Sequence, residues 1–81
     1  MKYIVTIMFL AILLFAKINI NTATIKELSS LKGIGEVKAS LIIKYRQQHP
    51  FKKIEDIMKV KGIGIKTFDK IKDKIEVKEN K

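Results

Sequence analysis

The sequence predicts an all-α domain of two pseudo-symmetric units, each made of two helices joined by a tight turn, and preceded by a hydrophobic leader. The strongest support is an internal repeat, because residues 31–35 (LKGIG) recur 29 positions later as residues 60–64 (VKGIG). A repeat at a fixed offset marks a duplicated structural unit. Apolar residues on both sides of each string recur at spacings of three and four, which is the period of an amphipathic helix. Each unit therefore has a short helix, a tight turn and a longer helix, and together they form one compact domain of four to five helices.

The first 16 residues differ in composition from the rest of the chain. A short basic start precedes residues 4–15, which are apolar apart from Thr6, and the run ends at Ala16 and Lys17. This core is shorter than the ~20 residues that a membrane-spanning helix needs, but it has the length of a signal-peptide core. Residues 1–16 are therefore predicted to be a signal peptide, with a periplasmic or other extracytoplasmic mature protein. An uncleaved inner-membrane anchor is the alternative.

The remaining chain is strongly basic and has no cysteine. The 81 residues carry 17 Lys and Arg against 8 Asp and Glu, a formal charge of +9, and Lys2 is the only charged residue of the leader. Residues 17–77 are thus predicted to be a small domain that folds without a disulfide or a thiolate metal site. The charge favours an anionic partner.

The first unit is expected to cover about residues 24–48. Thr24 and Glu27 have the spacing of a capping box, so the first helix should begin after Thr24. The second helix should run from about Glu36 to Gln48, because the residue before Pro50 resists the α conformation.

The second unit is expected to cover about residues 53–76. Phe51, in the connector between the units, should pack into the core. Lys53 is a poor cap for the third helix, and the negative charges of Glu55 and Asp56 in its first turn should compensate for this. The fourth helix is expected to extend to Ile75, and residues 78–81 to fray. The predicted core consists of Ile25, Leu28, Leu31, Val37, Leu41, Ile42, Tyr45, Ile54, Ile57, Val60, Phe68, Ile71 and Ile75.

The glycine turns are the candidate functional site. Glycine adopts positive φ readily and lets another backbone approach, and a helix that starts after a turn presents free N–H groups to an anion. Glycine also ends helices for structural reasons alone, so one such turn is ambiguous. Duplication and neighbouring lysines favour phosphate binding. The candidate residues are Lys32, Gly33, Ile34, Gly35 and Lys38 in the first unit, and Lys61, Gly62, Ile63, Gly64, Lys66 and Thr67 in the second.

The sequence offers little for catalysis. His49 is the only histidine, and no Ser-His-acid or metal-ligand spacing is present, so we predict no enzyme, no catalytic residue and no metal-ligating cluster. Lys66, Lys70 and Lys74 are spaced by four, and this stripe either follows a phosphate strand or only keeps the domain soluble.

Several strings together resemble tandem helix-hairpin-helix DNA-binding domains, and among these the ComEA-like DNA-uptake proteins of naturally transformable bacteria. The resemblance is carried by residues 18–24, 31–39, 42–46, 50–51 and 60–68. It implies that backbone amides of two hairpins hold phosphates without reading the bases. It also implies that some hairpins bind a monovalent cation through turn carbonyls; no other cofactor is expected. The chain departs from the family at Lys32, where relatives often carry proline, and at His49, where glycine is usual.

The resemblance implies a function in DNA uptake during natural transformation, through sequence-nonspecific binding of double-stranded DNA outside the cytoplasm. Its partners would be the phosphate backbone of DNA and components of a DNA-uptake channel, with no small-molecule substrate. Two alternatives stay open: an exported or membrane-tethered protein-interaction module, and a membrane-anchored accessory to DNA repair.

Overall fold

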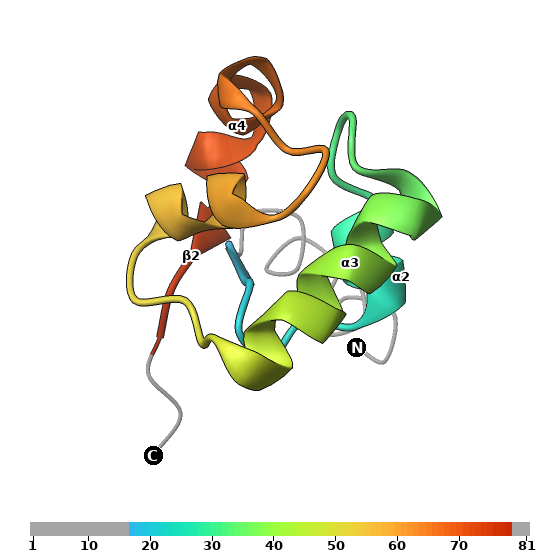
Figure 1. Ribbon diagram of the computed structural model, residues 1–81. Helices are drawn as coiled ribbons and strands as arrows, with labels where there is room; N and C mark the ends of the chain where they lie inside the picture. Colours follow the sequence, from blue (N-terminus) through green and yellow to red (C-terminus); the bar gives the residue numbers. More distant parts are fainter. Residues whose placement is uncertain (1–16, 79–81) are drawn as a thin grey trace, which may run out of the picture.

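The computed structural model describes residues 17–78, and the predicted all-α fold is confirmed (Figure 1). The predicted leader, residues 1–16, and residues 79–81 of the predicted tail lie outside the described residues. Along the chain the elements are β1 (Ile18–Asn19), α2 (Ile25–Ser29), α3 (Gly35–Gln48), η1 (Ile54–Lys59), α4 (Ile65–Ile71), η2 (Lys72–Lys74) and β2 (Ile75–Glu76). The two elements labelled η are 3-10 helices.

The first unit follows the sequence closely. The capping box of α2 is present, because the Thr24 hydroxyl accepts from the Glu27 N–H at 3.1 Å and the Glu27 carboxylate accepts from the Thr24 N–H at 2.9 Å. Helix α3 begins at Gly35, one residue before the expected start, and ends at Gln48 as expected. The first unit is therefore determined largely by local signals.

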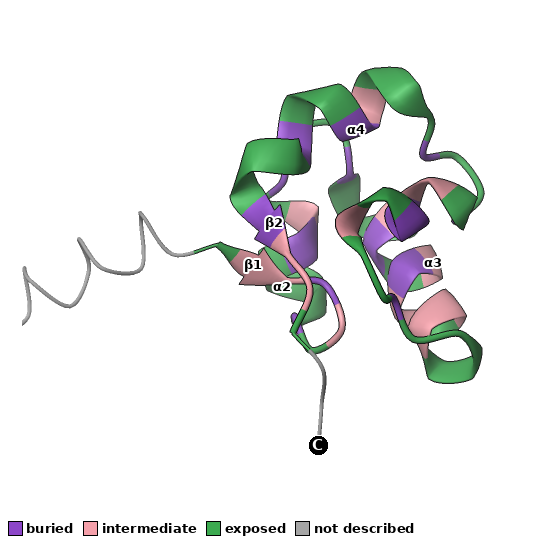
Figure 2. Ribbon diagram, turned by 90° about the vertical axis from the view of Figure 1, so that its left-hand side faces the viewer, coloured by how far each residue is buried: buried purple, intermediate pink, exposed green. Residues whose placement is uncertain are grey.

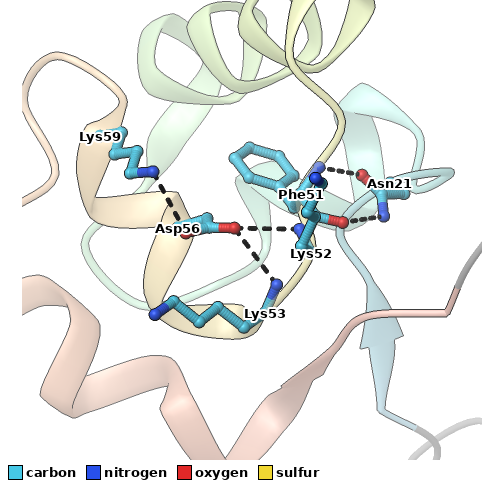
Figure 3. A network of polar contacts seen from close by, with 6 residues as sticks. All are labelled: Asn21, Phe51, Lys52, Lys53, Asp56 and Lys59. Carbon is cyan, nitrogen blue, oxygen red and sulfur yellow. Dashed lines mark hydrogen bonds and ion pairs between the residues drawn. The ribbon is translucent and has the colours of Figure 1, made fainter.

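The second unit starts differently, with a 3-10 helix in place of an α-helix. The Asp56 carboxylate accepts the N–H groups of Lys52 (3.0 Å) and Lys53 (3.3 Å), and its other oxygen lies 3.5 Å from the Lys59 ammonium (Figure 3). These bonds hold the start of η1, where Lys53 offers no side-chain cap. The Lys52 N–H, helped by the Lys53 N–H and the Lys59 charge, lowers the pKa of Asp56. Asp56 was expected only to compensate electrostatically for the poor cap at Lys53, but its carboxylate also accepts hydrogen bonds from the backbone at the start of η1.

The ends of the domain meet in a short parallel pairing that the sequence did not reveal. Ile18 of β1 pairs with Ile75 of β2, and Asn19 pairs with Glu76. The expectation that the fourth helix reaches Ile75 is wrong, because α4 ends at Ile71 and the chain becomes extended after η2. Ile75 is nevertheless buried, as part of a strand. The stripe of Lys66, Lys70 and Lys74 is therefore not one helix face.

The core lies between the two units, where the inward faces of the helices meet (Figure 2). Two predicted core residues are wrong: Val37 is 77% exposed and Ile25 is 45% exposed. Spacing alone misassigned them because both stand in the first turn of a helix, where a small shift of phase moves a side chain to solvent. Leu41, Tyr45 and Ile54 are only partly buried. The buried apolar residues are Ile20, Ala23, Leu28, Leu31, Ile34, Ala39, Ile42, Phe51, Ile57, Val60, Ile63, Phe68, Ile71 and Ile75.

Polar side chains join the N-terminal segment to the connector between the units. The Asn21 side chain accepts the Phe51 N–H and donates to the Phe51 carbonyl, both at 2.8 Å (Figure 3). Arg46 Nη1 donates to the carbonyls of Ile20 (3.1 Å) and Ala23 (2.7 Å). Desolvation at this site lowers the pKa of Arg46. These contacts hold the N-terminal segment against α3 and against the connector between the units.

Candidate nucleic-acid interface

Each glycine turn is anchored in the core by its central isoleucine. The Ile34 N–H donates to the Leu31 carbonyl and the Ile63 N–H to the Val60 carbonyl, both at 3.1 Å. Ile34 and Ile63 are both buried. These bonds are related by the offset of 29 residues, so the sequence repeat is also a repeat of turn geometry.

The glycines of the two turns differ in conformation at one of two positions. Gly33 (φ 84°) and Gly62 (φ 91°) both occupy the left-handed region. Gly35 does so as well (φ 64°), whereas Gly64 has φ −107° and is extended. Gly64 therefore has a conformation that any residue can adopt. Only three of the four positions require glycine for backbone reasons.

The two turns contact each other through side chains that the repeat relates. A Cβ placed on Gly62 would lie 3.5 Å from Lys38 Cε, and a Cβ placed on Gly33 would lie 3.6 Å from Thr67 Cγ2. Lys38 and Thr67 are equivalent at the offset of 29, so each hairpin covers the first glycine of the other. The turns before α3 and α4 accordingly lie side by side (Figure 1).

Free backbone donors gather at these turns. Within residues 17–78, the N–H groups of Gly33, Gly35, Gly62 and Gly64 donate to no backbone or side-chain acceptor. All four glycines are exposed, and the first backbone bond of α4 is donated by Phe68 to the Gly64 carbonyl at 2.9 Å. Exposed, unpaired N–H groups at positive φ or at a helix start form a donor surface that suits an anion.

The predicted cations divide into two groups. Lys32, Lys61 and Lys66 are exposed next to the turns. Lys38 is half-buried between the hairpins, and its ammonium donates to the Gly33 carbonyl at 3.2 Å. Lys38 therefore links the two hairpins and also contributes a positive charge. Thr67, its counterpart, is also half-buried, with its methyl group against Gly33.

The same bond bears on a monovalent cation site, which the family resemblance left open for these hairpins. A cation bound at the first hairpin would need turn carbonyls, but the Gly33 carbonyl already accepts from the Lys38 ammonium. An ammonium beside this oxygen repels a second cation. The first hairpin therefore does not fit a cation, and no role is derived for one.

Residues 17–78 contain no group of three or more His, Cys, Asp or Glu residues arranged to hold a metal ion. The same part of the chain contains no helix long and apolar enough to cross a membrane.

Arg46 and Asn21 support the site without belonging to it, and spacing analysis missed both. Arg46 is the only arginine of the chain, and its guanidinium is held by the carbonyls of Ile20 and Ala23. Both residues lie within the strings that carry the family resemblance, which was the available signal. Their contacts join α3 and the connector to the segment before α2.

Comparison with known proteins gives a consistent result. The family model described as "Helix-hairpin-helix motif" matches residues 15–76, which include both turns. The chain is 55% identical over 64 residues to ComE operon protein 1 of Bacillus subtilis (strain 168), covering 78% of this chain and 31% of that protein. It is 48% identical over 61 residues to an uncharacterized protein of Haemophilus influenzae, covering 73% of this chain and 54% of that protein.

A third relative is a much longer protein. The chain is 38% identical over 60 residues to endonuclease/exonuclease/phosphatase family domain-containing protein 1 of Mus musculus, covering 73% of this chain and 10% of that protein. The chain thus spans less than two thirds of each of these relatives. What they share with it is the segment that carries the hairpins.

Proposed function

The chain belongs to the helix-hairpin-helix family, and from this premise we propose that it binds double-stranded DNA through the backbones of both hairpins, without reading the base sequence. The observation that carries the proposal is the reciprocal contact of the turns through Lys38 and Thr67. This contact makes two donor surfaces into one rigid site. Two anion sites at a fixed separation suit a polymer with regularly spaced phosphates.

The binding chemistry is assigned to individual groups. The free N–H groups of Gly33 and Gly35 would hold a phosphate of one strand, and those of Gly62 and Gly64 a phosphate of the other. Ile34 and Ile63 use their own N–H groups inside the turns and serve as anchors. Exposed ammonium groups add attraction at longer range; they belong to Lys32, Lys61 and Lys66.

Sequence-blind binding follows from the donors available. Backbone amides and lysines bind phosphates, which carry no sequence information directly, whereas arginine forks are the commonest readers of guanine. The only arginine, Arg46, has its guanidinium engaged by two main-chain carbonyls. No catalytic step is derived from the described residues, so the proposed role is binding alone.

We place this binding outside the cytoplasm, in DNA uptake. The support is the similarity to ComE operon protein 1 together with the signal-peptide pattern of residues 1–16. In that role the domain would hold incoming duplex and oppose its backward movement, next to components of an uptake channel. Mass spectrometry of the native N-terminus tests the location, because a mature protein should begin near Lys17. An intact Met1 in the membrane fraction would replace export with an inner-membrane anchor.

The binding proposal is tested by competition between unrelated duplexes of equal length, followed by fluorescence anisotropy. All should compete equally, and log affinity should fall linearly with log salt. A preference above about tenfold, ~1.4 kcal/mol, for one sequence would contradict sequence-blind binding. Absence of duplex binding at moderate salt would instead favour the protein-interaction alternative.

A further inference from the structure

Two large aliphatic side chains are exposed beside the hairpin turns. Val37 is 77% exposed and Ile65 is 67% exposed, although each stands within three residues of a buried turn anchor. Among the described residues, Ile25 is the only other exposed large apolar residue, at 45%. Scattered exposed aliphatic residues need no explanation, but two of these three stand in the first turns of the helices that follow the hairpin turns. The same turns carry the free glycine amides.

The helix geometry gives the direction in which these side chains lean. Val37 is the third residue of α3 and Ile65 the first residue of α4. Cα–Cβ bonds in a helix tilt toward its N-terminus, so both side chains lean back toward the turns. A nucleic-acid backbone held at the glycine amides would therefore come close to these two side chains.

The spacing of the turns indicates which part of a duplex they would span. Lys38 and Thr67 each reach from one turn to the first glycine of the other, so the turns are separated by about one side chain. Two strands are closer across the minor groove (≈ 6 Å wide) than across the major groove (≈ 12 Å wide). The walls of the minor groove are the sugars, which in RNA display 2′-hydroxyls there.

We propose that Val37 and Ile65 pack against the deoxyribose edges of the bound duplex and make the site select DNA over RNA. This inference rests on the proposed function. Burial of an aliphatic side chain against sugar C–H groups is favourable. Against RNA the same side chains would remove water from 2′-hydroxyls and return no hydrogen bond, which is unfavourable.

The charges nearby are consistent with a nucleic acid as the occupant of this surface. Lys61 and Lys66 are exposed near Ile65, and Lys32 is exposed near the first turn. The aliphatic pair is thus flanked by cations that would attract phosphates on either side of a sugar. Glu36, next to Val37, is the one carboxylate in the first turn of α3.

The test is the double variant Val37→Ser with Ile65→Ser, measured by anisotropy on duplex DNA and on duplex RNA of the same sequence and length. DNA affinity should fall about tenfold (~1.4 kcal/mol), whereas RNA affinity should not fall, because serine removes the unfavourable apolar contact with the 2′-hydroxyls. The salt slope on DNA should stay the same, because no lysine is removed. Both residues are exposed, so circular dichroism and the melting temperature should match the parent protein.

Two controls separate this effect from a general loss of apolar surface. Ile25→Ser removes an exposed isoleucine away from the turns and should leave both affinities unchanged. Val37→Leu with Ile65→Leu keeps aliphatic contact and should keep the preference for DNA. An unchanged DNA affinity in the serine variant, or an equal loss on both polymers, would overturn the inference. Binding to anionic vesicles that depends on the pair, with DNA affinity unchanged, would overturn it in favour of a membrane surface.

These outcomes are distinct from failure of the proposed function. If the parent protein binds no duplex DNA, the hairpins are not a DNA site and the inference fails with them. If the parent binds DNA and the serine variant binds equally well, only the role of Val37 and Ile65 is refuted.

Discussion

The two hairpins share the string Lys-Gly-Ile-Gly but use its second glycine in different ways. In the first hairpin Gly35 has φ 64° and is the first residue of the 14-residue helix α3. In the second, Gly64 is extended and precedes the 7-residue helix α4. The first glycine and the isoleucine behave alike in both. The identical string therefore determines the positive φ of the first glycine and the burial of the isoleucine. The conformation of the second glycine depends on its surroundings.

Those surroundings differ on both sides of the turn. The first hairpin is entered from α2, an α-helix with a capping box, and the second from η1, a 3-10 helix held by the Asp56 carboxylate. The side chain that reaches from the first hairpin to the second is Lys38, and the one that reaches from the second to the first is Thr67. The pseudo-symmetry thus holds for the first glycine and the buried isoleucine of each hairpin, and it is loose elsewhere.

The largest effects are expected where the hairpins are alike. Gly33→Val and Gly62→Val should each lower the free energy of unfolding by about 2–3 kcal/mol, because both positions have positive φ and a β-branched residue there is strained. The added side chain would also press on Thr67 or Lys38. Urea denaturation measures both variants. A marked difference between them would show that the turns are not equivalent at this position.

The second glycines should respond differently from each other. Gly35→Ala should cost about 1–2 kcal/mol of stability, because its φ of 64° is unfavourable for a residue with a Cβ. Gly64→Ala should change stability by less than about 0.5 kcal/mol, because its backbone is extended and a Cβ there meets no atom within 4 Å. Thermal and urea unfolding of the pair check this. Equal losses would contradict the structural difference between the turns.

Gly64→Val separates folding from binding. The protein should remain as helical and nearly as stable as the parent, while duplex DNA affinity falls about tenfold, since the side chain occupies the space in front of the free amides. Circular dichroism and anisotropy are measured on the same sample. A variant that folds and binds like the parent would remove the second hairpin from the site.

Lys38→Thr makes the first hairpin resemble the second. The Lys38 ammonium bond to the Gly33 carbonyl is lost, so stability should fall by no more than about 1 kcal/mol. The slope of log affinity against log salt should become shallower by up to ~0.9, because one cation near the phosphates is removed. Lys70→Thr, on the exposed side of α4, is the matched control and should leave the slope unchanged. An unchanged slope in Lys38→Thr would show that Lys38 acts only as a bridge.

The smallest effect concerns the pH dependence of stability, and it acts through the second unit. Hydrogen bonds lower the pKa of Asp56 below its ordinary value of 3.8, so its carboxylate stabilises the fold above that value and ceases to do so as the pH falls through the lowered pKa. Asp56→Asn should therefore be less stable than the parent at neutral pH and show a smaller loss below pH 3.8. Unfolding followed from neutral to acid pH checks the slope. Identical pH profiles would show that Asp56 does not brace η1.

Much of the first unit was predictable, because its signals are local. The Thr24 capping box, the stop before Pro50 and the burial of Ile34 depend on neighbours in the chain. The burial of Val37 was predicted wrongly, since periodicity gives the faces of a helix but not which face meets the core at its first turn. The second unit was less predictable, because η1 depends on the carboxylate of a residue that looked like a surface charge.

The sequence by itself determined the duplication, the helical class, the two turns and the positive charge around them, since each follows from spacing or composition. Only the tertiary structure decided that Lys38 and Thr67 cross between the hairpins, that Gly64 needs no special φ, and that Arg46 is held inside the protein. It also decided the pairing of Ile18 with Ile75. These contacts join residues more than twenty positions apart, or depend on them, and local propensity carries no information about which distant groups will meet when the core closes.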